Sequence, residues 1–437
     1  MDFAFTPEQE ALRQAIRAYL AQELTPEFRN VRYEVAGVGV SREFSQKLGQ
    51  QGWIGLAWPE EYRSIPNPLA VGARYIVPLR DLSPSPLREG GNLTLAPSQE
   101  GRGNDRVGDA GQGFGYMEFL IYREEMVMAG APIAYHLTAE NQMAPSIMLN
   151  GSEEQKRSFI PRIASGEMSI CIGYSEPGTG SDLASLETRA ERDGDDYVIS
   201  GVKTWNSGAR HSQYVWLAAR TNQDAPKHRG ISVFLVDMAL PGISVRPIVN
   251  MGGVDGFSTI VFDRVRVPKG AMVGDVDQGW YVAAQNLDYE RSGIERVASN
   301  YPVLRDFTAY IKEAQVGGKA IASRPEVRHR VAQMYIDLEV GRWLAYKIAW
   351  MQSQGQVPNK EASVSKLFGA ETTQRNARGM LEVMGLYGQL AEGSPYAPLQ
   401  GRLLRAWYGG VSATIAAGTS EIQQNIIAQR GLGMPRG

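Results

Sequence analysis

The sequence predicts an α+β chain, mainly helical, in which one block of β-strands separates two helical regions. Apolar residues near the amino terminus recur at one-turn spacing, as at Leu12, Ile16 and Leu20, which is the pattern of an amphipathic helix. From about residue 167 to 278, short β-branched and aromatic runs bounded by turn residues replace that pattern. Helical periodicity returns from Gly279 onward. Because strands and helices do not alternate, a doubly wound nucleotide-binding fold is disfavoured.

Residues 1–166 are expected to form an amino-terminal helical domain. Its first helix has a hydroxyl cap at Thr6, proline at the first helical position, and Gln9 placed to complete a capping box. Further helical stretches are expected over residues 42–48, 116–130 and 153–164.

A proline- and glycine-rich stretch, residues 63–110, interrupts this domain. It contains six prolines and six glycines, a density too high for a helix or a central strand. A functional lid and a disordered surface insertion both fit such a composition. The insertion is the preferred interpretation, because a stretch of this kind cannot bury a core of its own.

Residues 167–278 are expected to form a middle β domain, and residues 279–437 a carboxy-terminal helical bundle. The predicted strands lie at residues 197–200, 214–217, 231–236 and 259–262. Asp193-Gly194-Asp195 predicts a tight turn leading into the first of these strands. In the last domain, Ser323-Arg324-Pro325-Glu326 is interpreted as a helix cap, followed by apolar positions as far as Trp350.

The composition excludes several classes of protein. Among the 437 residues, 43% are hydrophobic and 21% are charged, as in ordinary globular proteins. A net charge of -2 argues against an extended nucleic-acid surface. The one cysteine, Cys171, excludes an intrachain disulfide, and the four histidines lack metal-ligand spacing. The amino terminus does not resemble a signal peptide and no apolar run is long enough to span a bilayer, so a cytoplasmic protein without a metal is expected.

Two short motifs have the residue types of a ligand site. The loop from Cys171 to Asp182 has glycines that allow close backbone approach and hydroxyls that can hydrogen-bond a polar ring edge or a phosphate. It matches neither a P-loop nor the Gly-x-Gly-x-x-Gly fingerprint. Further on, Trp205 and the hydroxyl of Ser207 lie beside a turn, and an aromatic plane next to small polar groups suits a flat heteroaromatic cofactor. Taken alone, each motif is equally compatible with an ordinary turn and a core tryptophan.

Together the two motifs resemble the signature of the acyl-CoA dehydrogenase family. That signature reads approximately Thr-Glu-Pro-x-x-Gly-Ser-Asp, followed by Lys-x-Trp-x-Thr/Ser. The chain has Ser175-Glu176-Pro177 with Gly180-Ser181-Asp182, then Lys203 with Trp205 and Ser207. Gly418-Thr419-Ser420-Glu421-Ile422-Gln423 resembles the family's carboxy-terminal landmark. The resemblance implies a helical amino-terminal domain, a middle β-barrel or sandwich and a carboxy-terminal four-helix bundle.

The resemblance also implies that FAD binds between the β domain and the bundle, with a second subunit completing the site. The residues that it assigns to FAD are Ile172, Gly173, Tyr174, Ser175, Gly180, Ser181, Trp205, Ser207, Thr419 and Glu421. The residues that it assigns to the acyl-CoA substrate are Ser181, Asp288, Arg291, Ala417 and Gly418.

The catalytic base is the point at which this chain departs from most of the family. The usual base directly precedes the Gly-Thr of the last motif, where this chain has Ala417, whose methyl group cannot accept a proton. The isovaleryl- and long-chain-type members instead have a glutamate directly before an arginine on a bundle helix. Glu290-Arg291 resembles that arrangement, which implies Glu290 as the base. Glu421 is an alternative base, and outside the family frame Glu290 is interpreted as a solvated surface residue.

The implied reaction is oxidation of an acyl-CoA thioester to a trans-2-enoyl-CoA, with electrons passing to an electron-transfer flavoprotein. An acyl-CoA oxidase and a non-catalytic or half-site subunit of a heteromeric enzyme remain alternatives. Residues 310–319 lack the Arg-Phe-Gly pattern with which many members contact FAD across the dimer. Both a homotetramer and a heterotetramer therefore fit the sequence, and it does not indicate the type of acyl group.

Overall fold

The computed structural model describes residues 4–29, 33–35, 38–62, 115–291, 293–356 and 358–435. Within these ranges it leaves out the side chains of residues 29, 33–35, 60, 285 and 287–291. The predicted insertion, residues 63–110, lies outside the described residues.

The amino-terminal region is helical, as predicted. Its first helix, α1 (Pro7–Glu23), begins with the predicted capping box, in which the Gln9 amide donates to Thr6 Oγ1 at 3.2 Å and the Thr6 amide donates to Gln9 Oε1 at 3.1 Å. The stretch after residue 130 carried no prediction, and it contains a π-helical turn, Ala139–Met143, between two short helices. The other elements of this region are α2 (Pro26–Arg29), β1 (Tyr33–Val35), β2 (Val38–Gly39), α3 (Arg42–Gln50), α5 (Tyr116–Met128), α6 (Ala134–Thr138), α7 (Ala144–Asn150) and α8 (Glu153–Ala164).

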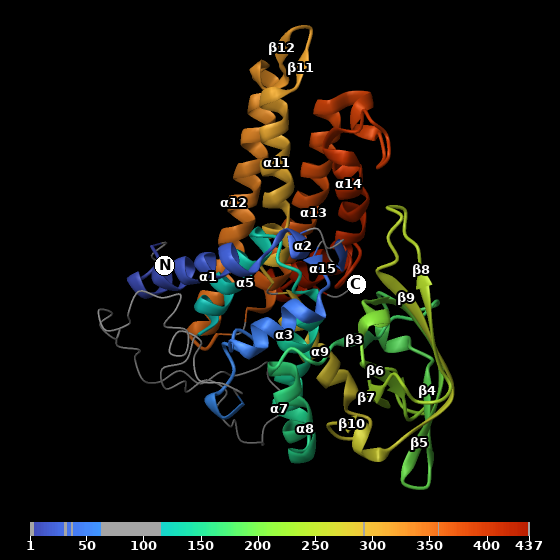
Figure 1. Ribbon diagram of the computed structural model, residues 1–437. Coiled ribbons are helices and arrows are strands. Elements are labelled where there is room, and N and C mark those ends of the chain that lie inside the picture. Colours follow the sequence, from blue (N-terminus) through green and yellow to red (C-terminus); the bar gives the residue numbers. More distant parts are fainter. Residues whose placement is uncertain are drawn as a thin grey trace.

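The middle region is a twisted sheet at one side of the molecule (Figure 1). Its strand order is β10-β7-β6-β4-β5-β9-β8, with β3 paired to β6. Most pairings are antiparallel, and only β3 and β4 run parallel to β6. The turn predicted at Gly194 joins β4 to β5 with Asp193 opposite Asp196. The strands are β3 (Ile170–Gly173), β4 (Arg189–Asp193), β5 (Asp196–Ser207), β6 (Tyr214–Arg220), β7 (Ile231–Asp237), β8 (Ile243–Ile248), β9 (Phe257–Val267) and β10 (Met272–Val273).

The carboxy-terminal region is again helical. The helices α11, α12, α13 and α14 pack side by side and extend away from the rest of the molecule (Figure 1). The helix start predicted at Ser323-Arg324-Pro325-Glu326 is confirmed: α12 begins at Pro325 with Arg324 at its cap position. No side chain caps this helix, and the Ser323 hydroxyl donates to the Ala320 carbonyl. The elements are α9 (Gly279–Arg291), α10 (Glu295–Ala298), α11 (Asn300–Glu313), β11 (Gln315–Val316), β12 (Lys319–Ala320), α12 (Pro325–Ser353), α13 (Asn359–Met384), α14 (Arg402–Ala413) and α15 (Ser420–Ile426).

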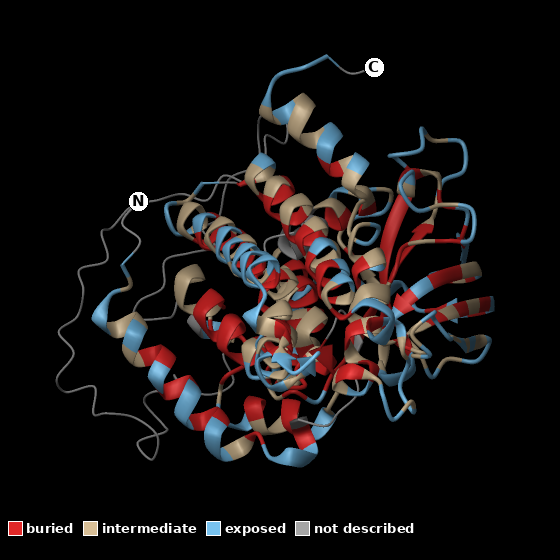
Figure 2. Ribbon diagram, turned by 90° about the horizontal axis from the view of Figure 1, so that it is seen from above, coloured by how far each residue is buried: buried red, intermediate tan, exposed pale blue. Residues whose placement is uncertain are grey.

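One apolar core runs through all three regions. It includes Leu12 of α1, Trp216 of β6, Val282 of α9 and Ala345 of α12. Figure 2 shows buried residues on the inward faces of the helices and exposed residues on their outer faces. The order helical, β, helical is therefore confirmed, and the shared core fixes where the β domain meets α9.

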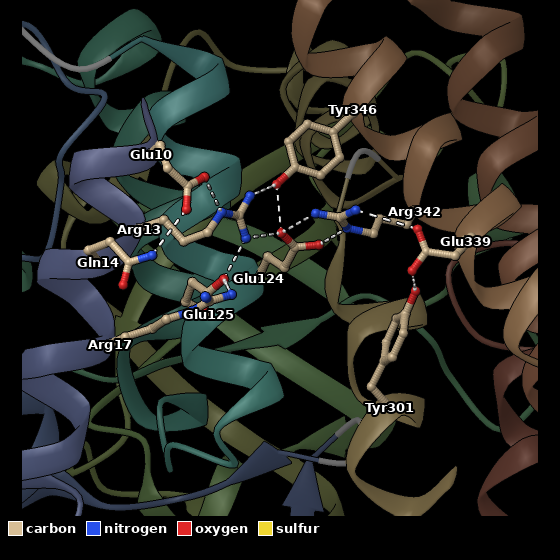
Figure 3. A network of polar contacts seen from close by, with 10 residues as sticks. All are labelled: Glu10, Arg13, Gln14, Arg17, Glu124, Glu125, Tyr301, Glu339, Arg342 and Tyr346. Atoms are coloured by element: carbon tan, nitrogen blue, oxygen red, sulfur yellow. Dashed lines mark hydrogen bonds and ion pairs between the residues drawn. The ribbon is translucent and has the colours of Figure 1, made fainter. Parts of the chain in front are cut away.

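A buried polar network joins the amino-terminal helices to α12 (Figure 3). Arg13 Nη1 lies 2.8 Å from Glu124 Oε2, and the Tyr346 hydroxyl donates to the same oxygen at 2.6 Å. Arg342 completes the contact from α12, with its Nη2 3.2 Å from Glu124 Oε2. Although burial disfavours the charged form, the guanidinium groups of Arg342 and Arg13 lower the pKa of Glu124.

Among the described residues, none of the helices combines the length and apolarity needed to cross a membrane. The same part of the chain holds no group of three or more His, Cys, Asp or Glu side chains that could bind a metal ion.

Candidate active site

The two motifs of the β domain lie next to each other. The Asn206 side-chain amide donates to the Ile172 carbonyl at 2.6 Å, and the Thr204 backbone amide donates to the Ser175 carbonyl at 2.9 Å. These bonds hold the end of β3 and the residues after it against β5. The structure thus brings the segment Ile172, Gly173, Tyr174 and Ser175 together with Trp205 and Ser207.

A buried ion pair fixes the loop that follows Ser175. Lys203 Nζ lies 2.8 Å from Glu176 Oε1 and also donates to the Tyr174 carbonyl at 3.0 Å. Burial lowers the pKa of Lys203 to about 8. The Glu176 carboxylate accepts the backbone amides of Glu187 at 2.6 Å and Thr188 at 2.8 Å. Because a buried charge must be paired and hydrogen-bonded, this pair fixes the shape of the loop.

Trp205 is unusual in two ways. Its φ of 61° lies in the left-handed region, where β5 and β9 shift register, and 60% of its surface is exposed. A β-bulge re-aims a side chain, and this one turns the indole outward. The planes of the indole and the Phe257 ring are nearly perpendicular, with 6.2 Å between the ring centroids. A large exposed indole on a rigid strand is a surface that a flat ligand can cover.

Ser207 borders a small pocket between β5 and the amino-terminal region. The residues that line this pocket are Val40, Ala134, Tyr135, Thr138, Ser169, Ile170, Ser207, Gly208, His211 and Ser212.

Gly180 and Ser181 lie on the exposed part of the loop. A side chain at Gly178 or Gly180 would meet no atom within 4 Å, so the backbone there is open to a ligand. The neighbouring Asp182 is paired with Lys227 at 2.8 Å on the surface.

The carboxy-terminal motif forms its own compact turn. Ala417 has a φ of 57°, and its carbonyl accepts a bond from Gln423 Nε2 at 3.0 Å. Thr419 caps α15, with its hydroxyl accepting the Ile422 amide at 3.2 Å. The hydrogen bonds of Ala417, Gly418 and Thr419 among the described residues stay within this segment, so none of them reaches the β-domain motifs. Hydrogen bonds from its own backbone amide and the Thr419 hydroxyl lower the pKa of the exposed Glu421.

Glu290, Asp288 and Arg291 lie in the last turns of α9, and their side chains are outside the described part of the structure. The helix itself packs against β7, the π-helical turn and α13. Helix α13 also packs against α15. The Ala417 segment and the helix that carries Glu290 are therefore neighbours of the same helix.

Sequence reasoning assigned no role to five residues that support the predicted site. Lys203, Asn206, Asn286 and Gln423 hydrogen-bond with predicted site residues, and Glu176 pairs with Lys203. A signal for Lys203 was available, because Tyr197, Ile199 and Lys203 fall on the same period-two positions of the strand and are all buried. A signal for Asn286 was its one-turn spacing from both Val282 and Glu290. The bonds of Asn206 and Gln423 had no such signal.

The residues of these motifs fit a large flavin nucleotide. The indole of Trp205 offers an uncovered plane, and Gly178 and Gly180 leave room for close backbone approach. Four buried polar atoms in these motifs have no hydrogen-bond partner among the described residues: Thr179 Oγ1, Asn206 Oδ1, Ser420 Oγ and Gln423 Oε1. Buried polar atoms are nearly always bonded, so these four are free to meet a polar ligand.

The structure therefore has three parts in chain order: a helical domain, a β domain and a second helical domain. The family models "Acyl-CoA dehydrogenase, N-terminal domain", "middle domain" and "C-terminal domain" match residues 6–67 with 106–167, 171–265 and 277–432, respectively. The chain belongs to the acyl-CoA dehydrogenase family, and it is an oxidoreductase that acts on CH–CH groups.

Several known proteins match this chain over its whole length. It is 36% identical to the acyl-CoA dehydrogenase FadE26 of Mycobacterium tuberculosis, over 100% of this chain and 99% of that protein. Among solved structures, the Tcur3481-Tcur3483 steroid ACAD has a TM-score of 0.80 at 31% identity, with 100% of both chains covered. The ChsE4-ChsE5 complex from Mycobacterium tuberculosis has a TM-score of 0.78 at 34% identity, also with 100% of both chains covered.

Proposed function

We propose that this chain uses FAD to oxidise an acyl-CoA thioester to the trans-2-enoyl-CoA, with Glu290 as the base. Glu290 takes the proton from the α-carbon while the β-carbon loses a hydride, and a carbon–carbon double bond forms between them. FAD, when bound, accepts that hydride, and an electron-transfer flavoprotein then removes the two electrons. Ile172 to Ser175, Gly180, Ser181, Trp205, Ser207, Thr419 and Glu421 would hold the cofactor.

The observation that carries this proposal is the placement of α9. Asn286, one turn before Glu290, hydrogen-bonds with Tyr174 in the segment assigned to the flavin. Ala417 offers no proton acceptor in its side chain. Its backbone N–H makes no hydrogen bond among the described residues, so it is available to donate to the thioester carbonyl and stabilise the developing enolate. The lowered pKa of the exposed Glu421 makes that carboxylate a weak base, which argues against the alternative.

The test is anaerobic bleaching of the bound flavin by acyl-CoA thioesters. Glu290→Gln keeps the shape of the side chain but cannot accept the proton, so we expect bleaching to slow by at least about a thousandfold while the cofactor stays bound. Glu421→Gln tests the alternative base. Measured at saturating FAD, so that any loss of cofactor affinity is compensated, it should bleach at a rate within about threefold of the unmodified enzyme. Rapid bleaching of the Glu290→Gln protein would contradict the proposed base. Release of hydrogen peroxide during aerobic turnover would indicate an oxidase instead.

The proteins named as similar also suggest a substrate class and an assembly. One is called a steroid ACAD, and two are named as pairs of chains. We therefore propose a CoA thioester of a steroid or its side chain as substrate, and a heterotetramer formed with a second, different subunit.

The buried free thiol of Cys171 suits a reducing compartment such as the cytoplasm.

The same bleaching assay tests this assignment. Steroid-derived thioesters are expected to bleach the flavin faster than linear acyl-CoA thioesters do. Purification of this chain alone as a homotetramer with one flavin per subunit would rule out the heteromeric assembly.

A further inference from the structure

Among the side chains of α9 that the structure describes, one polar group is completely buried in the core. Asn286 has 0% exposure, and a buried amide is costly unless its hydrogen bonds are made. The side-chain amide is oriented so that each of its neighbours gains a suitable hydrogen-bond partner. Its oxygen then accepts hydrogen bonds from Trp216 Nε1 at 2.8 Å and from the Tyr174 hydroxyl at 3.2 Å. Its nitrogen donates to the Gln142 carbonyl at 3.0 Å and to Ser146 Oγ. We call these five residues the anchor cluster.

The anchor cluster draws on four separate elements besides α9. Trp216 is on β6, Tyr174 follows β3, Gln142 is in the π-helical turn and Ser146 is on α7. Its side chains are buried, with exposures from 0% to 8%. An amide offers two donor and two acceptor positions, and all four are used. The cluster therefore ties α9 to both other domains through directional bonds.

The anchor cluster lies close in sequence to both the proposed base and the segment assigned to the flavin. Glu290 follows Asn286 by four residues, which is about one turn and about 6 Å along the axis. Tyr174 lies directly before Ser175 in the segment assigned to the flavin. The Asn286–Tyr174 contact thus joins the helix of the proposed base to the segment of the proposed cofactor.

We propose that Asn286 and Tyr174 are positioning residues, which hold the Glu290 turn of α9 in register with the flavin-binding end of β3. This rests on the proposed function, in which Glu290 is the base. Apolar packing is non-directional, so the neighbouring Val282 and Ala283 do not by themselves fix the rotation of α9 about its axis. The four hydrogen bonds of the Asn286 amide are directional, and they fix this rotation. Proton abstraction needs that precision, because a misplacement of 1 Å can slow a reaction about a hundredfold.

The first test compares two tyrosine hydroxyls. Tyr174→Phe removes a hydroxyl from the anchor cluster. Tyr346→Phe is the matched control, since that buried hydroxyl also makes two hydrogen bonds, to Glu124 at 2.6 Å and with Arg13 at 3.0 Å, and neither involves the anchor cluster. We expect Tyr174→Phe to slow flavin reduction by about tenfold with KM changed less than twofold, and α-deuterated substrate to show a larger isotope effect. Tyr346→Phe should change none of these. Equal behaviour of the two variants would overturn the inference.

The second test does not depend on turnover. Amide hydrogen exchange of the peptide that covers residues 279–286 reports how firmly α9 is held. In the purified full chain, both Tyr174→Phe and Asn286→Leu are expected to raise exchange there at least about threefold, while Tyr346→Phe leaves it unchanged. Unchanged exchange in the first two variants would refute a positioning role.

The Glu290→Gln background separates the two proposals. Tyr174→Phe should slow flavin reduction no further when Glu290 is already replaced, because its effect passes through that carboxylate. A fast Glu290→Gln enzyme would contradict the proposed base and with it this inference. A slow Glu290→Gln enzyme together with a fast Tyr174→Phe enzyme would contradict the inference alone.

Discussion

Ala417 shows how one residue changes the chemistry expected of a whole family site. Its φ of 57° places a non-glycine residue in the left-handed region, at a cost of about 1 kcal/mol. The next residue, Gly418, has no such freedom to change: its φ is 84°, and an added Cβ would lie 2.6 Å from Gln423 Nε2. Gly418 therefore fixes the shape of this turn, and the methyl group of Ala417 cannot accept a proton.

We expect that a glutamate introduced at residue 417 can replace Glu290 as the base. In the Glu290→Gln background, Ala417→Glu restores a carboxylate at the position that most of the family uses. We expect the double variant to reduce its flavin about tenfold faster than Glu290→Gln alone, because the acceptor returns on a turn already built for it. Ala417→Gln in the same background is the control, and it should give no recovery. Equal rates for the two double variants would show that this turn lies out of reach of the substrate.

At the scale of an element, the π-helical turn Ala139–Met143 places a carboxyl group inside the core. Glu140 is 1% exposed, and its Oε1 accepts the Gly55 amide at 2.7 Å. Burial raises the pKa of Glu140 to about 7. A raised pKa means that the folded protein holds the proton more tightly than the unfolded chain does.

Stability should therefore depend on pH through Glu140. The contribution of protonated Glu140 to the free energy of unfolding is fully present below pH 4.5, and it is lost as the pH rises through about 7. Glu140→Gln has no proton to lose, so we expect its stability relative to the unmodified protein to rise by about 3 kcal/mol between pH 4.5 and pH 8. Urea unfolding of both proteins across this range measures the difference. A difference that stays constant with pH would show that folding does not raise the pKa of Glu140.

At the scale of the whole molecule, charged groups far apart in the sequence connect the amino-terminal helices to the bundle (Figure 3). The Glu124 side chain is fully buried, and Arg13 and Arg342 approach it from α1 and α12. Removing one partner of such a group leaves charge uncompensated in the core. The network therefore makes the two helical regions depend on each other.

Arg342→Met is expected to lower the free energy of unfolding by about 3 kcal/mol, since Glu124 would lose its pairing from the bundle. Arg378→Met is the matched control: Arg378 also pairs with a glutamate, Glu382, at 3.0 Å, but its side chain is 74% exposed against 16% for Arg342. The control should cost less than about 1 kcal/mol. Chemical denaturation compares the two, and similar losses would mean that the buried network contributes little.

Local patterns in the chain predicted most of the elements. The Thr6 cap, the Gly194 turn and the order helical, β, helical depend on neighbouring residues, and the structure bears them out. Short strands such as β8, which contains Pro247, were missed because they form only when β9 supplies a partner. The hairpin β11–β12 was missed for a similar reason, as it is two residues long on each side.

The motifs that name the family, and the absence of a carboxylate at residue 417, could be established from the residues alone, because both are properties of residue identity and spacing. Only the tertiary structure decided that Lys203 pairs with Glu176, that Trp205 faces outward and that Asn286 bonds Tyr174. Lys203 and Glu176 are 27 positions apart in the chain, and Asn286 and Tyr174 are 112 positions apart. Burial and hydrogen bonding between such distant segments arise from packing, which no local pattern of residues encodes.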